Sequence, residues 1–97
     1  MSTEIWSDGN TIWSKTTKYS NPTDHHDARA TNVLYRNGAL VTSGQQWGDP
    51  ASITLAVGFS EGNYTSSGIG DIYCYLASSF VETTSAAISN YKTGSRL

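Results

Sequence analysis

The chain has 97 residues, of which 37% are hydrophobic and 14% are charged, and its formal net charge is -2. A chain of this length forms one compact unit, so the sequence excludes a two-domain architecture and predicts a single β-rich domain over residues 1–97. Eight acidic residues against six basic ones provide no basic patch for a nucleic acid or an anionic membrane. No apolar stretch approaches the length of a transmembrane span.

Two turn motifs predict β-hairpins in the first half of the chain. Asp8-Gly9 separates two segments that both contain Ile-Trp, and Asn37-Gly38 separates two apolar segments. Both dipeptides readily take the positive φ angles of a two-residue type I′ turn. In the first hairpin the isoleucines then occupy one face and the indoles the other. The expected cross-strand pairs are Ile5 with Ile12, Tyr35 with Leu40, and Leu34 with Val41.

The remaining segments are predicted from periodicity and from turn residues. Residues 14–29 show no period and are expected to be mostly loop, with a short strand around Lys18 and Tyr19. Residues 44–50 and 62–70 are rich in turn-forming residues and are expected to connect strands. Residues 52–59 alternate strictly, which predicts a central, half-buried strand. A further strand is expected over residues 71–77, with Ile72, Cys74 and Leu76 facing inward and Tyr73 and Tyr75 facing outward.

The segment from residue 78 to residue 97 changes period. Its apolar residues recur at the spacing of one helical face, Ser79 with Glu82 matches a capping box, and Gly94 lies where a helix would stop. These features predict a C-terminal helix, with an extended strand or tail as the alternative because residues 80–84 are poor helix formers. The predicted fold class is mainly β, an antiparallel β-sandwich or meander of about five to six strands.

Three motifs that carry chemistry in other proteins have a simpler interpretation here. Gly58-Phe59-Ser60-Glu61-Gly62 matches a nucleophile elbow, but the residues that follow it favour a turn rather than the required helix. Asp24-His25-His26-Asp27 concentrates metal ligands, yet neighbours in an extended segment point to opposite sides, which favours a solvated loop. The single cysteine, Cys74, lies in an alternating apolar strand and is expected to be a buried thiol. We therefore expect no catalytic residue, no metal site and no cofactor.

The aromatic residues are too numerous for a core of this size, since the chain holds three Trp, six Tyr and two Phe. Exposed indoles and phenols on a rigid sheet suit stacking on sugar rings or contact with lipid headgroups, because one end is apolar and the other forms hydrogen bonds. Cover for a second core or an oligomer interface is the alternative. The candidate ligand-binding residues are Trp6, Trp13, Trp47, Tyr64, Tyr73 and Tyr75.

Several short motifs occur in the order seen in a known family. They are Trp13, Tyr19-Ser20-Asn21, His25-His26, Ala30-Thr31 with Val33, Asn37-Gly38, Trp47, Ala56-Val57-Gly58 and Ile72-Tyr73-Cys74-Tyr75. In this order the chain resembles the secreted bacteriocins of the lactococcin 972 family, which are small β-sandwich proteins without cysteine. The chain departs from that family in its acidity, in Cys74 and in the tail from Ser78. Thr54 to Ser60 with Asp71-Ile72-Tyr73 is similar to the central strands of actinoporins and fungal fruit-body lectins.

The resemblance implies an antimicrobial toxin that engages a lipid-linked precursor of the cell wall without catalysis. Together with the surplus of aromatic residues, it predicts a secreted, non-catalytic binding protein for a cell-envelope component, either that lipid precursor or a glycan. The alternative is a structural or interaction module that forms a homo-oligomer through its edge strands and exposed aromatic residues.

Overall fold

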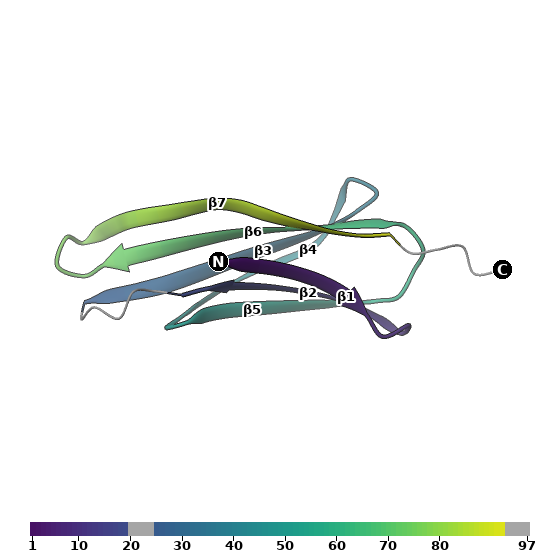
Figure 1. The fold of residues 1–97 in the computed structure, drawn as a ribbon, viewed down its shortest axis with the longest axis horizontal. Helices are drawn as coiled ribbons and strands as arrows, with labels where there is room; N and C mark the ends of the chain where they lie inside the picture. The colour runs from purple at the N-terminus through teal and green to yellow at the C-terminus, as the bar shows by residue number, and fades with distance from the viewer. Residues whose placement is uncertain (20–24, 93–97) are drawn as a thin grey trace.

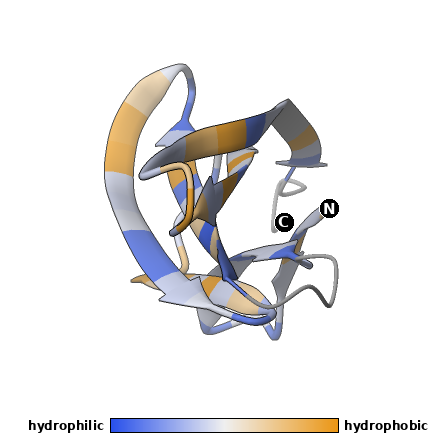
Figure 2. Cartoon of the chain, turned by 90° about the vertical axis from the view of Figure 1, so that its left-hand side faces the viewer, coloured by the Kyte–Doolittle hydropathy of each residue, from blue (hydrophilic) through white to orange (hydrophobic). Residues whose placement is uncertain are grey.

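The computed structural model describes residues 1–19 and 25–92, which form seven antiparallel β-strands and no helix (Figure 1). A three-stranded sheet in the order β1-β2-β5 faces a four-stranded sheet in the order β4-β3-β6-β7. Figure 2 views the same chain end-on. The predicted antiparallel sandwich is confirmed, with more strands than expected. None of the described residues belongs to a helix long and apolar enough to cross a membrane. The strands are β1 (Ser2–Ser7), β2 (Thr11–Lys18), β3 (His26–Arg36), β4 (Ala39–Gly48), β5 (Ala51–Gly58), β6 (Asn63–Cys74) and β7 (Ser79–Lys92).

The first hairpin, which joins β1 to β2, has a wider turn than the sequence predicts. The Asp8 carboxylate accepts hydrogen bonds from the backbone N–H groups of Asn10 (2.8 Å) and Thr11 (2.9 Å), and these bonds lower the pKa of Asp8. The strands are therefore paired two residues away from the predicted register, and Ile5 does not lie opposite Ile12. A shift of two leaves every side chain on its predicted face. The observed pairs include Ile5 with Ser14, Trp6 with Trp13 and Ser7 with Ile12.

The second hairpin turns at Asn37 and Gly38, whose φ angles of 51° and 81° fit the predicted type I′ turn. Beyond the turn, β4 carries one extra residue where the register shifts between Leu34 and Tyr35. One of the two predicted pairs is therefore wrong, because pairing beyond this β-bulge is displaced by one residue. The observed pairs are Tyr35 with Leu40, as predicted, and Leu34 with Thr42 in place of Val41.

Segments predicted as loops from their composition are parts of strands. Residues 14–18 lie in β2, residues 44–48 in β4, and residues 63–70 in β6. Their small residues serve close packing between the sheets rather than turns, as shown below for β6. The alternation of residues 52–59 is confirmed, but β5 is the edge of its sheet and not the centre. Leu76 lies in the turn after β6 and is 77% exposed, so its predicted inward position is wrong.

The C-terminal segment is a strand, β7, and not the predicted helix. It pairs with β6 along its whole length, from Ser79 opposite Cys74 to Lys92 opposite Asn63. Two register shifts each add one residue to β7, which displaces the apolar residues from a period of two toward a helix-like spacing. The hydroxyl and β-branched residues of 80–84, which favoured the alternative, suit this strand.

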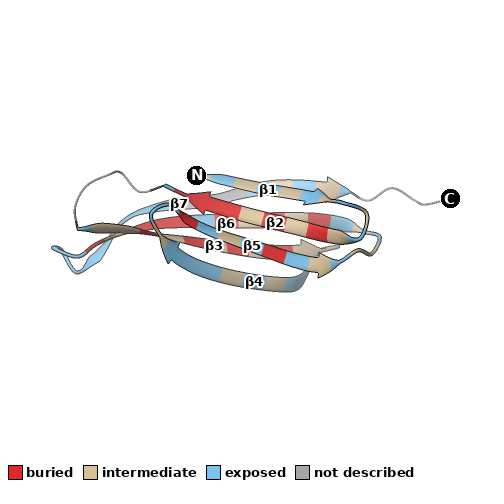
Figure 3. Ribbon diagram, turned by 90° about the horizontal axis from the view of Figure 1, so that it is seen from below, coloured by how far each residue is buried: buried red, intermediate tan, exposed pale blue. Residues whose placement is uncertain are grey.

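Polar residues divide the core into two apolar clusters. Asn32, Ser14 and Ser66 are all fully buried at its centre. Asn32 Nδ2 donates a hydrogen bond to Ser14 Oγ (2.8 Å), Ser66 Oγ donates one to Asn32 Oδ1 (2.9 Å), and the two serine hydroxyls also contact each other. Buried stretches lie on β2, β3, β5 and β6 and not on β1 or β4 (Figure 3). The clusters are Ile12, Leu34, Leu55 and Tyr64 on one side, and Ala28, Ala30, Ala51 and Ile72 on the other.

Gly68 and Gly70 of β6 lie against side chains of the opposite sheet. A Cβ atom at Gly68 would collide with the hydroxyl oxygens of Thr3 and Thr16 and would lie 2.8 Å from Thr16 Cγ2. A Cβ atom at Gly70 would lie 2.5 Å from Lys18 Cδ. Contact with the opposite sheet, and not a turn, therefore explains the glycine at position 68, whereas the atoms nearest a Cβ at Gly70 belong to the flexible side chains of Lys18 and Met1.

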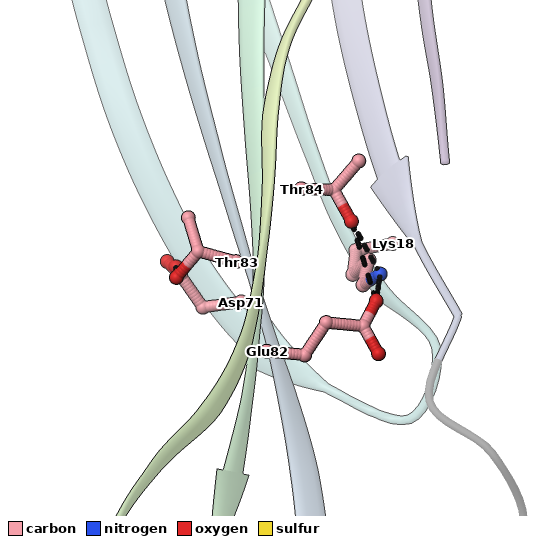
Figure 4. Close-up of polar contacts among 5 residues, drawn as sticks. All are labelled: Lys18, Asp71, Glu82, Thr83 and Thr84. Atoms are coloured by element: carbon pink, nitrogen blue, oxygen red, sulfur yellow. Dashed lines mark hydrogen bonds and ion pairs between the residues drawn. The ribbon is translucent and has the colours of Figure 1, made fainter.

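Lys18 of β2 ties β7 to the opposite sheet (Figure 4). Its side chain is 8% exposed, and Nζ donates to Glu82 Oε1 (2.6 Å) and to Thr84 Oγ1 (2.8 Å). This hydrogen bond and the charge of Lys18 lower the pKa of Glu82. Thr83, between the two, points to the other face of β7 and donates to Asp71 Oδ1 (2.8 Å). Successive residues of β7 therefore form hydrogen bonds on opposite faces of the sheet.

We expect Gly68→Ala to destabilise the protein by about 1–3 kcal/mol, because the added methyl group overpacks the narrowest part of the interior. Gly58→Ala is the matched control, since no atom lies within 4 Å of a Cβ atom built there, and its effect should stay within about 0.5 kcal/mol. Chemical denaturation measures both free energies of unfolding. Equal stability of the two variants would contradict the close approach of the sheets.

Candidate binding site

An open pocket of about 510 Å³ lies on the outer face of the four-stranded sheet. The fully buried Ala28 and Ala30 face the interior, so alternation along β3 directs Asp27 and Arg29 outward. We call this feature the aromatic pocket, because rings form most of its wall. Its lining residues are Asp27, Arg29, Trp47, Tyr73, Tyr75 and Phe80.

Strand register brings these residues together from all four strands of the sheet and from the turn after β6. No two neighbouring strands alone supply the whole set, because the wall crosses the sheet from β4 to β7. The cross-strand pairs that build it are Arg29 with Trp47, Arg29 with Asp71, Asp27 with Tyr73, and Tyr73 with Phe80.

The four rings of the pocket form one connected cluster. Tyr73 lies at its centre and meets Trp47, Tyr75 and Phe80 edge-on, with ring centroids 6.2, 5.3 and 5.2 Å away. Trp47 and Phe80 are stacked, with centroids 5.9 Å apart and an interplanar angle of 28°. Both arrangements are favoured by the charge distribution of aromatic rings, so the cluster holds its own geometry.

The Arg29 guanidinium group packs against two rings of this cluster and forms an ion pair. Its guanidinium carbon lies 4.3 Å from the Phe80 centroid and 5.4 Å from the Trp47 centroid. Nε and Nη2 donate to Asp71 Oδ2 at 2.9 and 2.8 Å. Asp71 is 6% exposed, and its other oxygen accepts from Thr83, as described above. The positive charge of Arg29 is therefore balanced within the wall of the pocket.

Asp27 adds a carboxylate to the lining of the pocket. Its Oδ2 accepts a hydrogen bond from the Tyr75 hydroxyl (3.2 Å), and its Oδ1 accepts one from the backbone N–H of Ala28 (3.0 Å). Partial removal from water and the nearby Asp27 carboxylate raise the pKa of Tyr75. The phenol is consequently protonated at neutral pH and remains a hydrogen-bond donor.

The sequence-predicted binding residues are distributed over three places. Trp47, Tyr73 and Tyr75 meet in the aromatic pocket. Trp6 and Trp13 form a stacked pair with centroids 6.4 Å apart on the three-stranded sheet. They face outward, away from the other sheet, because Ile5 and Ile12 face the interior.

Tyr64 lies in the core with 1% exposure and donates a hydrogen bond to the backbone oxygen of Ser60 (3.0 Å), so it offers no contact surface.

Three pocket residues were missed by sequence reasoning. Phe80 was assigned to a helix, while Asp27 and Arg29 fell in a predicted loop. The alternation of polar residues with alanine from Asp27 to Ala30 is the signal that identifies a strand there.

Of the three motifs, the segment Asp24-His25-His26-Asp27 contributes Asp27 to the pocket, and Ser60 and Cys74 do not line it. Ser60 lies 2.8 Å from the Tyr64 hydroxyl and is followed by strand β6. Cys74 is buried, as predicted. His25 is exposed in a turn with a φ angle of 78°, His26 begins β3, and Asp24 lies outside the described residues. Among residues 1–19 and 25–92, no group of three His, Cys, Asp or Glu side chains is placed to hold a metal ion.

Comparison with known proteins returned no relative. No family model matches the chain, and no match was found among curated proteins or solved structures. The aromatic pocket is therefore interpreted from its own residues: rings that stack on an apolar surface, next to a carboxylate and a guanidinium that bind polar groups.

We expect Arg29→Lys to destabilise the protein by about 1–2 kcal/mol, because lysine keeps the charge but loses the planar contact with Phe80 and Trp47. Arg29→Met should cost about 3 kcal/mol or more, because it leaves the buried carboxylate of Asp71 without its partner. Denaturant unfolding of both variants checks this order. A reversed order would show that the ion pair does not support the pocket.

Proposed function

We propose that the protein is a secreted, non-catalytic binding protein that holds a sugar unit of a cell-envelope glycan in the aromatic pocket. The observation that carries this proposal is the joining of four rings with Asp27 and Arg29 in one open pocket. A sugar ring has apolar faces that stack on aromatic side chains and hydroxyl groups that bind to carboxylate and guanidinium groups.

The setting of the pocket supports binding rather than chemistry. Its side chains lie mostly on strands, which hold them more rigidly than loops do. The Asp71 and Arg29 side chains bind each other and so fix the floor of the pocket. A hydrogen bond from the Tyr75 hydroxyl joins Tyr75 to Asp27. A preorganised wall of this kind lowers the entropic cost of holding a ligand.

The resemblance to the lactococcin 972 family supports the choice of a cell-envelope target and of secretion. In this proposal the protein acts as a bacteriocin-like toxin. A lipid-linked precursor of the cell wall, which carries sugar units of its own, is then the second candidate ligand.

A homo-oligomer is the second candidate, because β7 is the outermost strand of its sheet in the described part of the chain and leaves Val81 54% exposed and Ile88 62% exposed. Its two bulges weigh against this candidate, since they interrupt the regular hydrogen-bonding edge that a partner strand needs. Light scattering after size exclusion distinguishes the two, because a stable oligomer at micromolar concentration would favour the second.

We expect Trp47→Ala to weaken the binding of peptidoglycan fragments and N-acetylglucosamine oligomers by about tenfold or more, because it removes the largest ring of the wall. Isothermal titration calorimetry measures the affinity. Two controls, Trp13→Ala on the other sheet and Tyr35→Ala elsewhere on β3, should bind as the unaltered protein does. Equal loss in Trp13→Ala, or no binding by the unaltered protein, would rule out the pocket as the site.

A further inference from the structure

We infer that the aromatic pocket selects a sugar with a free, positively charged amino group over the same sugar in neutral, N-acetylated form. This inference rests on the proposed function and specifies the class of sugar. It follows from the charge that the pocket presents.

Arg29 contributes little net charge to a ligand. Two of its nitrogens bind Asp71 Oδ2, and the Asp71 side chain is 6% exposed and receives a further hydrogen bond from Thr83. In the part of the chain that the structure describes, Asp71 pairs with Arg29 and with no other cation, so a ligand anion would have to compete with Asp71 for the guanidinium group. The Arg29–Asp71 pair is therefore neutral as a unit, and it disfavours an acidic sugar.

Asp27 supplies the charge that a ligand meets. The sum over Asp27, Arg29 and Asp71 is one negative charge, and the ion pair of Arg29 with Asp71 leaves Asp27 as its source. A carboxylate has about four acceptor positions, of which the Tyr75 hydroxyl and the Ala28 N–H use two. The remaining positions suit an ammonium group, which offers three N–H donors.

The rings beside Asp27 favour the same ligand. Tyr73 lies opposite Asp27 across the strands, and Tyr75 is bonded to it, so two electron-rich rings flank the carboxylate. A cation near the face of such a ring is attracted by its quadrupole. The acidic balance of the whole chain adds a weak attraction of the same sign. A sugar with an ammonium group therefore gains both ring stacking and electrostatic attraction, whereas a neutral sugar gains ring stacking alone.

The test compares two probes that share ring and linkage, the tetrasaccharide of N-acetylglucosamine and its fully de-N-acetylated form. At low salt and a pH at which the amines are protonated, calorimetry should give about five- to tenfold tighter binding of the de-N-acetylated probe. Asp27→Asn should remove this preference and change the affinity for the acetylated probe by less than about twofold. Glu4→Gln, which removes the same charge from the other sheet, should keep the preference.

The outcomes separate this inference from the function on which it rests. If only the acetylated probe binds, or if both bind equally, the pocket binds sugars and the inference is wrong. If Glu4→Gln loses the preference as Asp27→Asn does, general attraction explains it and the inference again fails. If neither probe binds, the inference and the proposed function fall together. If Asp27→Asn does not fold, Tyr75→Phe, which retains the carboxylate, must keep the preference, and added salt must reduce it.

Discussion

The two sheets of the sandwich lie so close at Gly68 and Gly70 that neither position has room for a Cβ atom. The side chains of Thr3 and Thr16 fill the space beside Gly68, that of Lys18 fills the space beside Gly70, and the same interior holds buried serine and asparagine. The polar groups enclosed there must bind one another, and Asn32 does so with Ser14 and Ser66. Most of the large buried apolar residues lie in the cluster of Ile12, Leu34, Leu55 and Tyr64, and the other cluster is built from three alanines and Ile72.

A narrow interior also explains the position of the aromatic residues. Of the aromatic side chains in the described residues, Tyr64 is the one that is fully buried. Phe59 and Tyr91 are partly buried against the core cluster that contains Tyr64, whereas the rings on the two outer faces stay partly exposed. Trp6 and Trp13 stack on one face, and the rings of the aromatic pocket cluster on the other. The feature that suggests a binding function is therefore a consequence of how thin the sandwich is.

Strand β7 connects the packing of the interior to the pocket. On the inner side, Glu82 binds Lys18 of the opposite sheet. On the outer side, Thr83 binds Asp71, which in turn holds Arg29 under the rings. Phe80 completes the wall. Because Asp71 balances the charge of Arg29, the net charge of the pocket lining is that of Asp27.

The sequence by itself determined the β class, the type I′ turn at Asn37-Gly38, the inward faces of residues 52–59 and the burial of Cys74. These depend on alternation and turn residues, which act within a few positions along the chain. The tertiary structure alone decided the strand character of residues 63–70 and of β7, and it brought Asp27, Arg29 and Phe80 into one pocket. Residues 63–70 were not predictable because glycines that allow contact between sheets have the same composition as a turn. Strand β7 was not predictable because its bulges give apolar residues a spacing similar to that of a helix. The pocket was not predictable because pairing between distant strands leaves no local pattern in the sequence.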